Sequence, residues 1–174
     1  MTRIAALLSL IAVVATATYS AEFATRADLA RILRTERFKL IRHVRQISAS
    51  DWTAAGVHPQ GRSITASMVD PGYSYQDMDF GTGDMPQRQL FMAATNPRHE
   101  LIAYWQATQG GPVLRVLMLE RGNAKPRLIF YAIMNNDIDH ERWTWGELKG
   151  HILQNRMDHL LSAEQPGTFE NRLP

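Results

Sequence analysis

The chain has 174 residues, of which 45% are hydrophobic and 21% are charged, as is usual for one globular domain. It contains no cysteine, which excludes disulfides, thiol catalysis and cysteine-ligated zinc. The net charge of +2 is unevenly placed, because residues 23–50 contain seven basic and only two acidic residues. The sequence therefore predicts a basic segment attached to a mildly acidic body.

The first twenty residues differ from the rest of the chain. Arg3 gives a basic start, residues 4–17 (IAALLSLIAVVATA) carry no charge, and small residues follow. This layout is typical of a secretory signal peptide, so we expect residues 1–20 to be cleaved and the protein to be exported, periplasmic or secreted. The uncharged run continues to Ala21 and approaches the length of about 20 residues that a membrane span needs, so an uncleaved anchor is the alternative.

A long N-terminal helix is predicted over residues 26–47. Thr25 and Asp28 form a T-x-x-D capping pattern at its start. Apolar residues then recur at helical spacing on one face, namely Leu29, Leu33, Leu40, Val44 and Ile47. Residues 48–61 are rich in Ser, Asp, Gly and Pro, which predicts a loop after the helix.

The opposite side of this predicted helix carries four arginines around a phenylalanine. We call it the arginine face, and it consists of Arg31, Arg34, Phe38, Arg42 and Arg45. Four like charges at this spacing repel one another, so the pattern favours an anionic partner. That partner is either a protein with an acidic surface, with Phe38 as the apolar contact, or an anionic membrane surface. A solvated face without a partner is the alternative.

Nucleic acid is not an expected partner. Electrostatics alone would allow it, but an exported protein does not meet nucleic acid in its compartment. The predicted strands also lack the aromatic stacking motif that RNA-binding sheets use.

Apolar runs separated by turn residues predict a sheet. The predicted strands are residues 63–69, 90–94, 101–107, 113–120 and 127–134. Short turns that contain Asn, Gly and Pro connect them, which predicts an antiparallel meander of four to five strands. The run 127–134 (RLIFYAIM) is apolar on both faces. Both faces of the sheet must then be covered, by the two helices or by a second subunit, so a homodimer stays open.

Residues 70–88 (DPGYSYQDMDFGTGDMPQR) form the longest stretch without periodicity. Long irregular loops in compact domains are often functional, and tyrosines on such loops make effective contacts. We therefore predict partner binding by Tyr73, Tyr75, Asp77 and Asp79. The aspartates do not match a calcium-binding loop. Two alternatives remain, a surface loop whose aspartates cap turns and an acidic loop that lies against the arginine face.

A second polar stretch, residues 135–145, precedes the last predicted helix. His140 and Glu141 are adjacent there, and a carboxylate beside a histidine is what acid–base catalysis needs. Adjacent residues on an extended chain point apart, so catalysis at this position is only an alternative. Thr144 and Glu147 form a capping box, which predicts a C-terminal helix that reaches about Ser162.

These patterns predict one α+β domain over residues 21–164, with residues 165–174 as a flexible tail. The antiparallel sheet would be packed by the long N-terminal helix and the C-terminal helix. The sequence contains no catalytic, cofactor or metal motif, so we expect no catalytic residues, no cofactor and no metal. The predicted function is protein–protein binding in the cell envelope, by an inhibitor, an immunity-type protein or an assembly accessory.

Two other functions stay open. One is an exported small-molecule binding or sensing domain with a pocket lined by Tyr104, Trp105 and Tyr131. The other is an enzyme of unknown class built around His140 and Glu141.

Overall fold

The structure is a computed structural model that describes residues 23–57, 67–76, 85–122, 125–134, 143–154 and the backbone of 159–160. The predicted signal peptide and tail, residues 1–20 and 165–174, lie outside the described residues. In the described segments, no helix combines the length and the apolar character that a membrane span requires.

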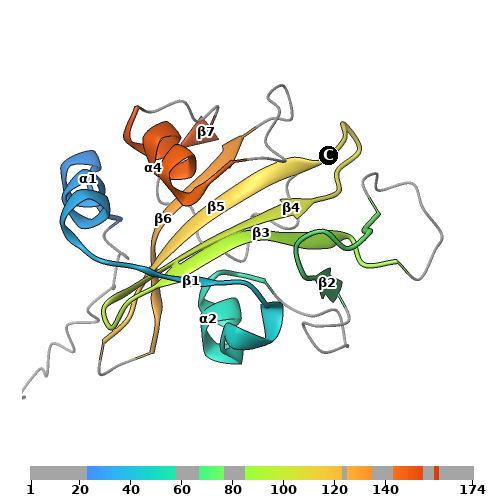
Figure 1. Cartoon of the computed structure of the whole chain (residues 1–174), viewed down its shortest axis with the longest axis horizontal. Helices are drawn as coiled ribbons and strands as arrows, with labels where there is room; N and C mark the ends of the chain where they lie inside the picture. The colour runs from blue at the N-terminus through green and yellow to red at the C-terminus, as the bar shows by residue number, and fades with distance from the viewer. Residues whose placement is uncertain are drawn as a thin grey trace, which may run out of the picture.

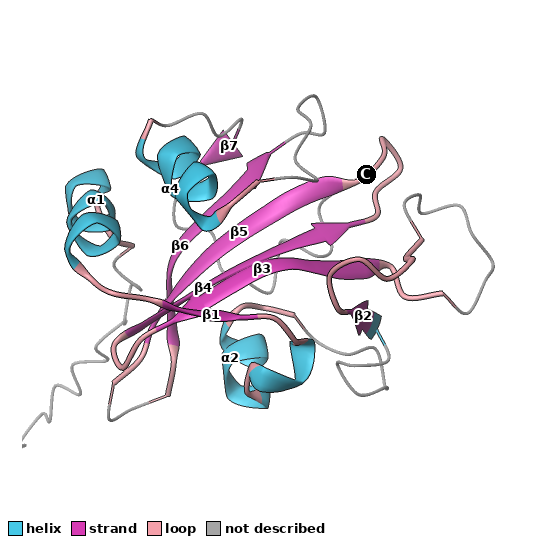
Figure 2. Ribbon diagram, in the orientation of Figure 1, coloured by secondary structure: helices cyan, strands magenta, loops and turns pink. Residues whose placement is uncertain are grey.

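A mostly antiparallel sheet of seven strands forms the centre of the molecule (Figures 1 and 2). Its four main strands, each eight residues long, are β3 (Arg88–Thr95), β4 (His99–Gln106), β5 (Val113–Glu120) and β6 (Arg127–Met134). Each main strand pairs with the next in antiparallel order. The predicted α+β class and the antiparallel sheet are therefore confirmed.

Three short strands extend this meander. They are β1 (Lys39–Ile41), β2 (Met68–Val69) and β7 (His159–Leu160). The first two pair with β3, and the third pairs with β6. The predicted strand at residues 63–69 is present only as β2, which runs parallel to β3, and residues 63–66 lie outside the described part of the chain.

Two apolar cores lie on opposite faces of the sheet, because successive side chains of a strand point to opposite sides. The face that carries Trp105 is covered by α1 (Arg26–Thr35) and α4 (Trp145–Leu153), and we call it the α1/α4 face. The face that carries Tyr104 is covered by α2 (Ala49–Ala54), and we call it the α2 face. Figure 1 shows α1 and α4 on one side of the sheet and α2 on the other.

The prediction of a long N-terminal helix is wrong, because α1 ends at Thr35. The chain continues into β1 and then into a 3₁₀ turn, η1 (Val44–Gln46). Leu40 was assigned to the apolar face of a helix, but it is 42% exposed, whereas the neighbouring Ile41 is buried. Pairing of β1 with β3 supplies the backbone hydrogen bonds that the helix would have made, and it avoids four arginines on one helical face.

The prediction of a loop directly after residue 47 is also wrong, because α2 occupies residues 49–54. Ser48 caps this helix, and its Oγ accepts a hydrogen bond of 3.1 Å from the backbone nitrogen of Asp51. The S-x-x-D pattern is the same signal that marks α1, where Thr25 Oγ1 accepts from the nitrogen of Asp28. Both predicted helices pack on the α1/α4 face, so α2 is the element that covers the second face.

The C-terminal helix begins as predicted and ends earlier than predicted. Thr144 donates its backbone N–H to Glu147 Oε2 at 2.6 Å, and Glu147 donates its own to Thr144 Oγ1 at 3.3 Å. This is the capping box expected from the sequence. The helix ends at Leu153, and residues 159–160 form β7 instead of a further helical turn, so the predicted extension to Ser162 is wrong.

Candidate functional site

A polar cleft of about 960 Å³ lies beside α1 at one end of the sheet. Its walls come from α1, from the turn between β3 and β4, and from the ends of β5 and β6, which lie together on the left-hand side of Figure 1. Four arginines line it, so we call it the arginine cleft: Arg31, Arg98, Arg121 and Arg127. The acids that line it are Asp28, Glu36 and Glu120.

Three of the four arginines are only weakly held by acids. Arg31 lies 3.7 Å from Asp28, and Arg127 lies 2.6 Å from Glu120, with all four side chains largely exposed. Among the described residues, Arg98 makes no ion pair and is exposed. Because exposed ion pairs contribute roughly 0–1 kcal/mol, these guanidinium groups can exchange partners at little cost.

Glu36 and His99 form a partly buried pair in the wall of the arginine cleft. Glu36 Oε2 lies 2.7 Å from His99 Nδ1 and accepts a second hydrogen bond of 2.7 Å from Asn96 Nδ2. Burial of the carboxylate raises its pKa, but the hydrogen bonds from His99 and Asn96 outweigh burial and place the pKa of Glu36 below its usual value. The pair joins the residue that caps the end of α1 to the β3–β4 turn.

A carboxylate that orients an imidazole is also the arrangement of a general base. Such a base needs a hydroxyl or another group to activate. Among the described residues that line the cleft, Thr25 carries the sole hydroxyl, and that hydroxyl donates to Asp28 at 2.6 Å. The contacts that the pair makes join the end of α1 to the β3–β4 turn.

Arg121 is the fourth arginine and differs from the others because it is held on two sides. Its Nη2 lies 2.5 Å from Asp51 Oδ2 and 2.5 Å from Glu100 Oε2, and its Nη1 donates to Thr95 Oγ1 at 2.8 Å. Asp51 belongs to α2, so Arg121 joins the element that covers the α2 face to the end of the sheet. This network fixes one wall of the arginine cleft.

The two carboxylates bound to Arg121 respond to it differently. Burial raises the pKa of Asp51, but the hydrogen bonds from Arg121 and Ser48 outweigh it, so its pKa is lowered. Burial, followed by repulsion from Asp51, raises the pKa of Glu100 to about 7. The charge of Arg121 and a side-chain hydrogen bond from Thr95 lower this pKa, but burial is the larger effect.

The structure does not bring the predicted arginine face together. Arg31 lines the arginine cleft, and Arg34 is exposed on α1 outside the cleft lining. Phe38 lies beyond the helix and is half-buried, with its ring centroid 5.5 Å from that of Trp145. Phe38 therefore belongs to the core of the α1/α4 face and not to the centre of an exposed arginine cluster.

Arg42 and Arg45 are exposed and follow β1 at the edge of the sheet. Asp70, the first residue of the predicted acidic loop, lies against this segment. Its carboxylate accepts from the backbone nitrogen of Val44 at 2.6 Å and contacts His43 Nδ1 at 3.0 Å. Burial raises the pKa of Asp70, but these bonds and the nearby Arg45 lower it overall. These contacts are with Val44 and His43 and not with the residues of the arginine face, so neither alternative for the loop as a whole is decided by Asp70.

The predicted contact residues of the loop have different environments. Tyr73 is 66% exposed, and its backbone carbonyl accepts from Gln89 Nε2 at 2.5 Å. Tyr75 is half-buried and packs against the core of the α1/α4 face. Asp77 and Asp79 lie outside the described residues, as do His140 and Glu141 of the alternative catalytic stretch.

The predicted small-molecule pocket lined by Tyr104, Trp105 and Tyr131 is wrong. Tyr104 and Tyr131 belong to the core of the α2 face, whereas Trp105 belongs to the core of the α1/α4 face. Adjacent residues of a strand cannot line one cavity within a single layer, because their side chains point to opposite sides of the sheet.

Sequence reasoning missed the arginine cleft, although a signal for it is present. In an antiparallel meander, every second turn lies at the same end of the sheet. The β3–β4 turn and the segment that follows β5 therefore lie at the same end of the sheet. They contain Arg98 and Arg121. They are joined directly, because the backbone nitrogen of Arg121 donates to the carbonyl of Arg98 at 2.5 Å. The contact of Glu36 with the β3–β4 turn could not be recognised from the sequence, because a continuous helix over residues 26–47 places Glu36 in the middle of that helix.

Within the described segments, no group of three or more His, Asp or Glu side chains is placed to hold a metal ion. Comparisons with known proteins gave no match, since no protein-family model, no curated protein and no solved structure resembles this chain. The residues of the arginine cleft are thus the basis for a functional proposal.

Proposed function

We propose that this protein is a small exported protein that acts by protein–protein binding in the cell envelope. Its arginine cleft receives an acidic segment of the partner, in the manner of an inhibitor, an immunity-type protein or an assembly accessory. The observation that carries the proposal is the convergence of Arg31, Arg98 and Arg127 on one cleft, where their own ion pairs are weak or absent among the described residues.

The shape of the site favours a protruding peptide over a membrane surface. A concave cleft of about 960 Å³ can surround an extended acidic segment, whereas a flat layer of lipid headgroups contacts only its rim. Arg121 is already bound to Asp51 and Glu100, so it shapes one wall of the cleft, and the charges that would bind the segment are Arg31, Arg98 and Arg127.

A defined peptide tests this proposal. We expect a fluorescent peptide of ten glutamates to bind the purified full chain, and the binding to weaken between low and high salt. The double substitution Arg31→Glu with Arg98→Glu should weaken this binding by about tenfold or more, because two charge contacts become repulsive. Fluorescence anisotropy measures both effects, and thermal unfolding should be nearly unchanged because both side chains are exposed.

The matched control is Arg34→Glu with Arg42→Glu. It makes the same change of net charge with exposed arginines that do not line the cleft. We expect it to weaken binding much less than the cleft substitution. Equal losses in both variants would mean that net charge alone attracts the peptide. A loss in the control variant alone would place the contact on Arg34 and Arg42. Either result contradicts binding in the cleft.

A further inference from the structure

One buried arginine on the α2 face makes no ion pair with the residues that the structure describes. Arg115 lies in the middle of β5, between two paired strands, and is only 2% exposed. It alternates with Leu114 and Val116, which belong to the core of the α1/α4 face, so its own side chain lies on the α2 face. That position is surrounded by apolar residues, because the α2 face is the second hydrophobic core of the molecule.

The guanidinium of Arg115 has two buried nitrogens, Nε and Nη2, with no hydrogen-bond partner among the described residues. These two nitrogens form one side of the planar group, and their N–H bonds point in the same direction. This is the fork that binds both oxygens of a carboxylate at once. The two unpartnered nitrogens therefore indicate both where a ligand would lie and that it would carry a carboxylate.

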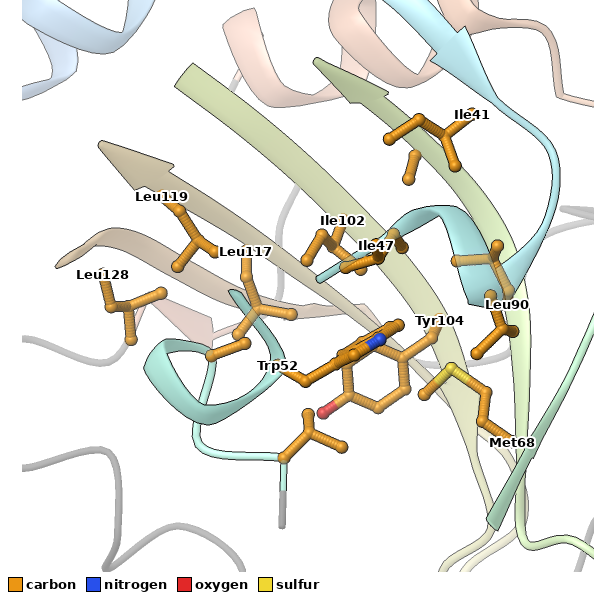
Figure 3. Close-up of a cluster of buried hydrophobic side chains, with 14 of the residues drawn as sticks. Ile41, Ile47, Trp52, Met68, Leu90, Ile102, Tyr104, Leu117, Leu119 and Leu128 are labelled. Carbon is orange, nitrogen blue, oxygen red and sulfur yellow. The ribbon is translucent and has the colours of Figure 1, made fainter. Parts of the chain in front are cut away.

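A second unpartnered donor lies near this position. Trp52 of α2 is 1% exposed, and its Nε1 has no hydrogen-bond partner in the described part of the structure. Figure 3 shows the Trp52 ring against Tyr104 with Met68 beside them, and the two ring centroids are 6.3 Å apart. Tyr104 is the residue of β4 that pairs directly with Arg115. Two groups that can only donate hydrogen bonds thus flank the same tyrosine.

The buried acids of this face, Asp51 and Glu100, form their ion pairs with Arg121 and not with Arg115. Glu100 lies four residues from Tyr104 along β4, which is about 13 Å at the rise of a strand. Glu100 and Asp51 are both bound to Arg121 instead. A buried charge without a partner is strongly destabilising, and native proteins compensate it.

We propose that Arg115 binds the carboxylate of a small organic acid with an apolar body, held between α2 and the sheet. A carboxylate carries the single charge that one guanidinium balances, and its two oxygens match Nε and Nη2. The apolar body is required because the residues that flank Arg115 on its face of the sheet, Tyr104, Leu117 and Ile133, belong to the hydrophobic core of the α2 face. Trp52 Nε1 supplies an additional donor. This site is separate from the arginine cleft and does not depend on the proposed function of the cleft.

Thermal unfolding of the full chain tests this site with hexanoate as the probe and hexanol as its uncharged control. We expect hexanoate to raise the Tm by about 5 °C at a concentration a hundred times its Kd. Hexanol at the same concentration should raise it much less. Native mass spectrometry of the freshly purified protein is expected to show a bound monocarboxylic acid.

Two matched substitutions identify the residue. Arg115→Met should abolish the shift with hexanoate and leave the Tm of the ligand-free protein equal to or above that of the wild type, because it removes an uncompensated charge. Arg121→Met is the control, since the same change there removes the partner of Asp51 and Glu100 and should lower the Tm.

Three results would overturn the proposal. One is that hexanoate and hexanol shift the wild-type Tm equally, a measurement that does not depend on any variant folding. Another is that Arg115→Met lowers the Tm as much as Arg121→Met, which would mean that the chain itself pairs Arg115. The last is that hexanoate shifts the Arg115→Met variant as much as the wild type.

Discussion

Glu100 and Asp51 share one arginine, and yet folding shifts their pKa values in opposite directions. Asp51 accepts hydrogen bonds from Arg121 and Ser48, so its charged form is favoured in the folded protein. Glu100 is fully buried in β4, and burial together with repulsion from Asp51 outweighs the effects of Arg121 and Thr95, so its neutral form is favoured. Hydrogen bonds to the charged form decide the direction of the pKa shift of Asp51, whereas burial decides it for Glu100.

Stability should therefore depend on pH in two separate ranges. The pKa of Glu100 rises on folding from an ordinary value of 4.5 to about 7, so the folded state binds more protons between these values. The free energy of unfolding then decreases as the pH rises through this range. The pKa values of Asp51, Glu36 and Asp70 are lowered on folding, so the stability that they contribute is lost as the pH falls below about 4.

The substitution Glu100→Gln should remove the first of these effects. We expect the variant to exceed the wild type in the free energy of unfolding by on the order of 2–3 kcal/mol at pH 8 and by little at pH 5. Urea unfolding at several pH values measures the difference. Glu120→Gln, in an exposed pair with Arg127, is the control and should differ little from the wild type at either pH. A difference that is constant between pH 5 and pH 8 would contradict the assignment to Glu100.

At the scale of elements, the segment from residue 36 to residue 47 shows how tertiary contacts override periodicity. Leu29 and Leu33 do face the core, as the helical pattern predicted. Beyond Thr35, the side chain of Glu36 binds the β3–β4 turn and Phe38 packs on Trp145. No local pattern contains these contacts, because their partners lie about 60 and 107 positions further along the chain.

Other elements were predictable from local patterns. The four main strands and the capping box at Thr144 appear where short apolar runs and turn residues indicated them. The start of α2 at Ser48 was equally readable from its capping pattern, but only six helical residues follow it. A helix of six residues is too short for a helical periodicity to be recognised in the sequence. Trp52, its large apolar residue, was the other feature that could have indicated a buried helix.

The changed role of Phe38 gives a prediction for this segment. Phe38→Ala should lower the free energy of unfolding by about 2 kcal/mol, because the ring is half-buried and packs against Trp145. Arg42→Ala, at an exposed position nearby, should change it by less than about 0.5 kcal/mol. Denaturation in urea distinguishes the two. If Phe38→Ala unfolds at the same urea concentration as the wild type, Phe38 is not part of the core.

For the molecule as a whole, the central strands belong to two cores at once. Strands β4, β5 and β6 send alternate residues into the α1/α4 face and into the α2 face. Both cores must therefore be lost when these strands separate. The short strands β1 and β2 lie at the edge of β3 and are held by few backbone pairs.

Hydrogen exchange should reveal this difference. Backbone amides in the middle of β4 and β5 are expected to exchange only when the whole protein unfolds, whereas amides of β1 and β2 should exchange through local opening. Mass spectrometry of exchanging peptides measures both. Equal protection of β1 and β5 would contradict the view that the shared strands form the most stable unit.

The sequence could predict that both faces of the sheet are covered, but not what each face contains. A run such as VLRVLMLE identifies a buried strand, and it shows one arginine within it. Whether Arg115 meets a carboxylate depends on the side chains of β4, β6 and α2 that share its face. Their identity follows from the register of the strands and from the position of α2, and neither is encoded locally.

The alternation of the two cores along β4 has a consequence for how such a chain can evolve. Ile102 and Ala103 are neighbours in sequence, but they contribute to separate cores, so a change in one places little constraint on the other. Asp51 and Arg121 are 70 positions apart, and replacing Arg121 alone would leave the buried Asp51 without its ion-pair partner. In a family of diverging descendants, correlated substitutions should link distant positions on one face of the sheet and be scarce between adjacent positions of a strand.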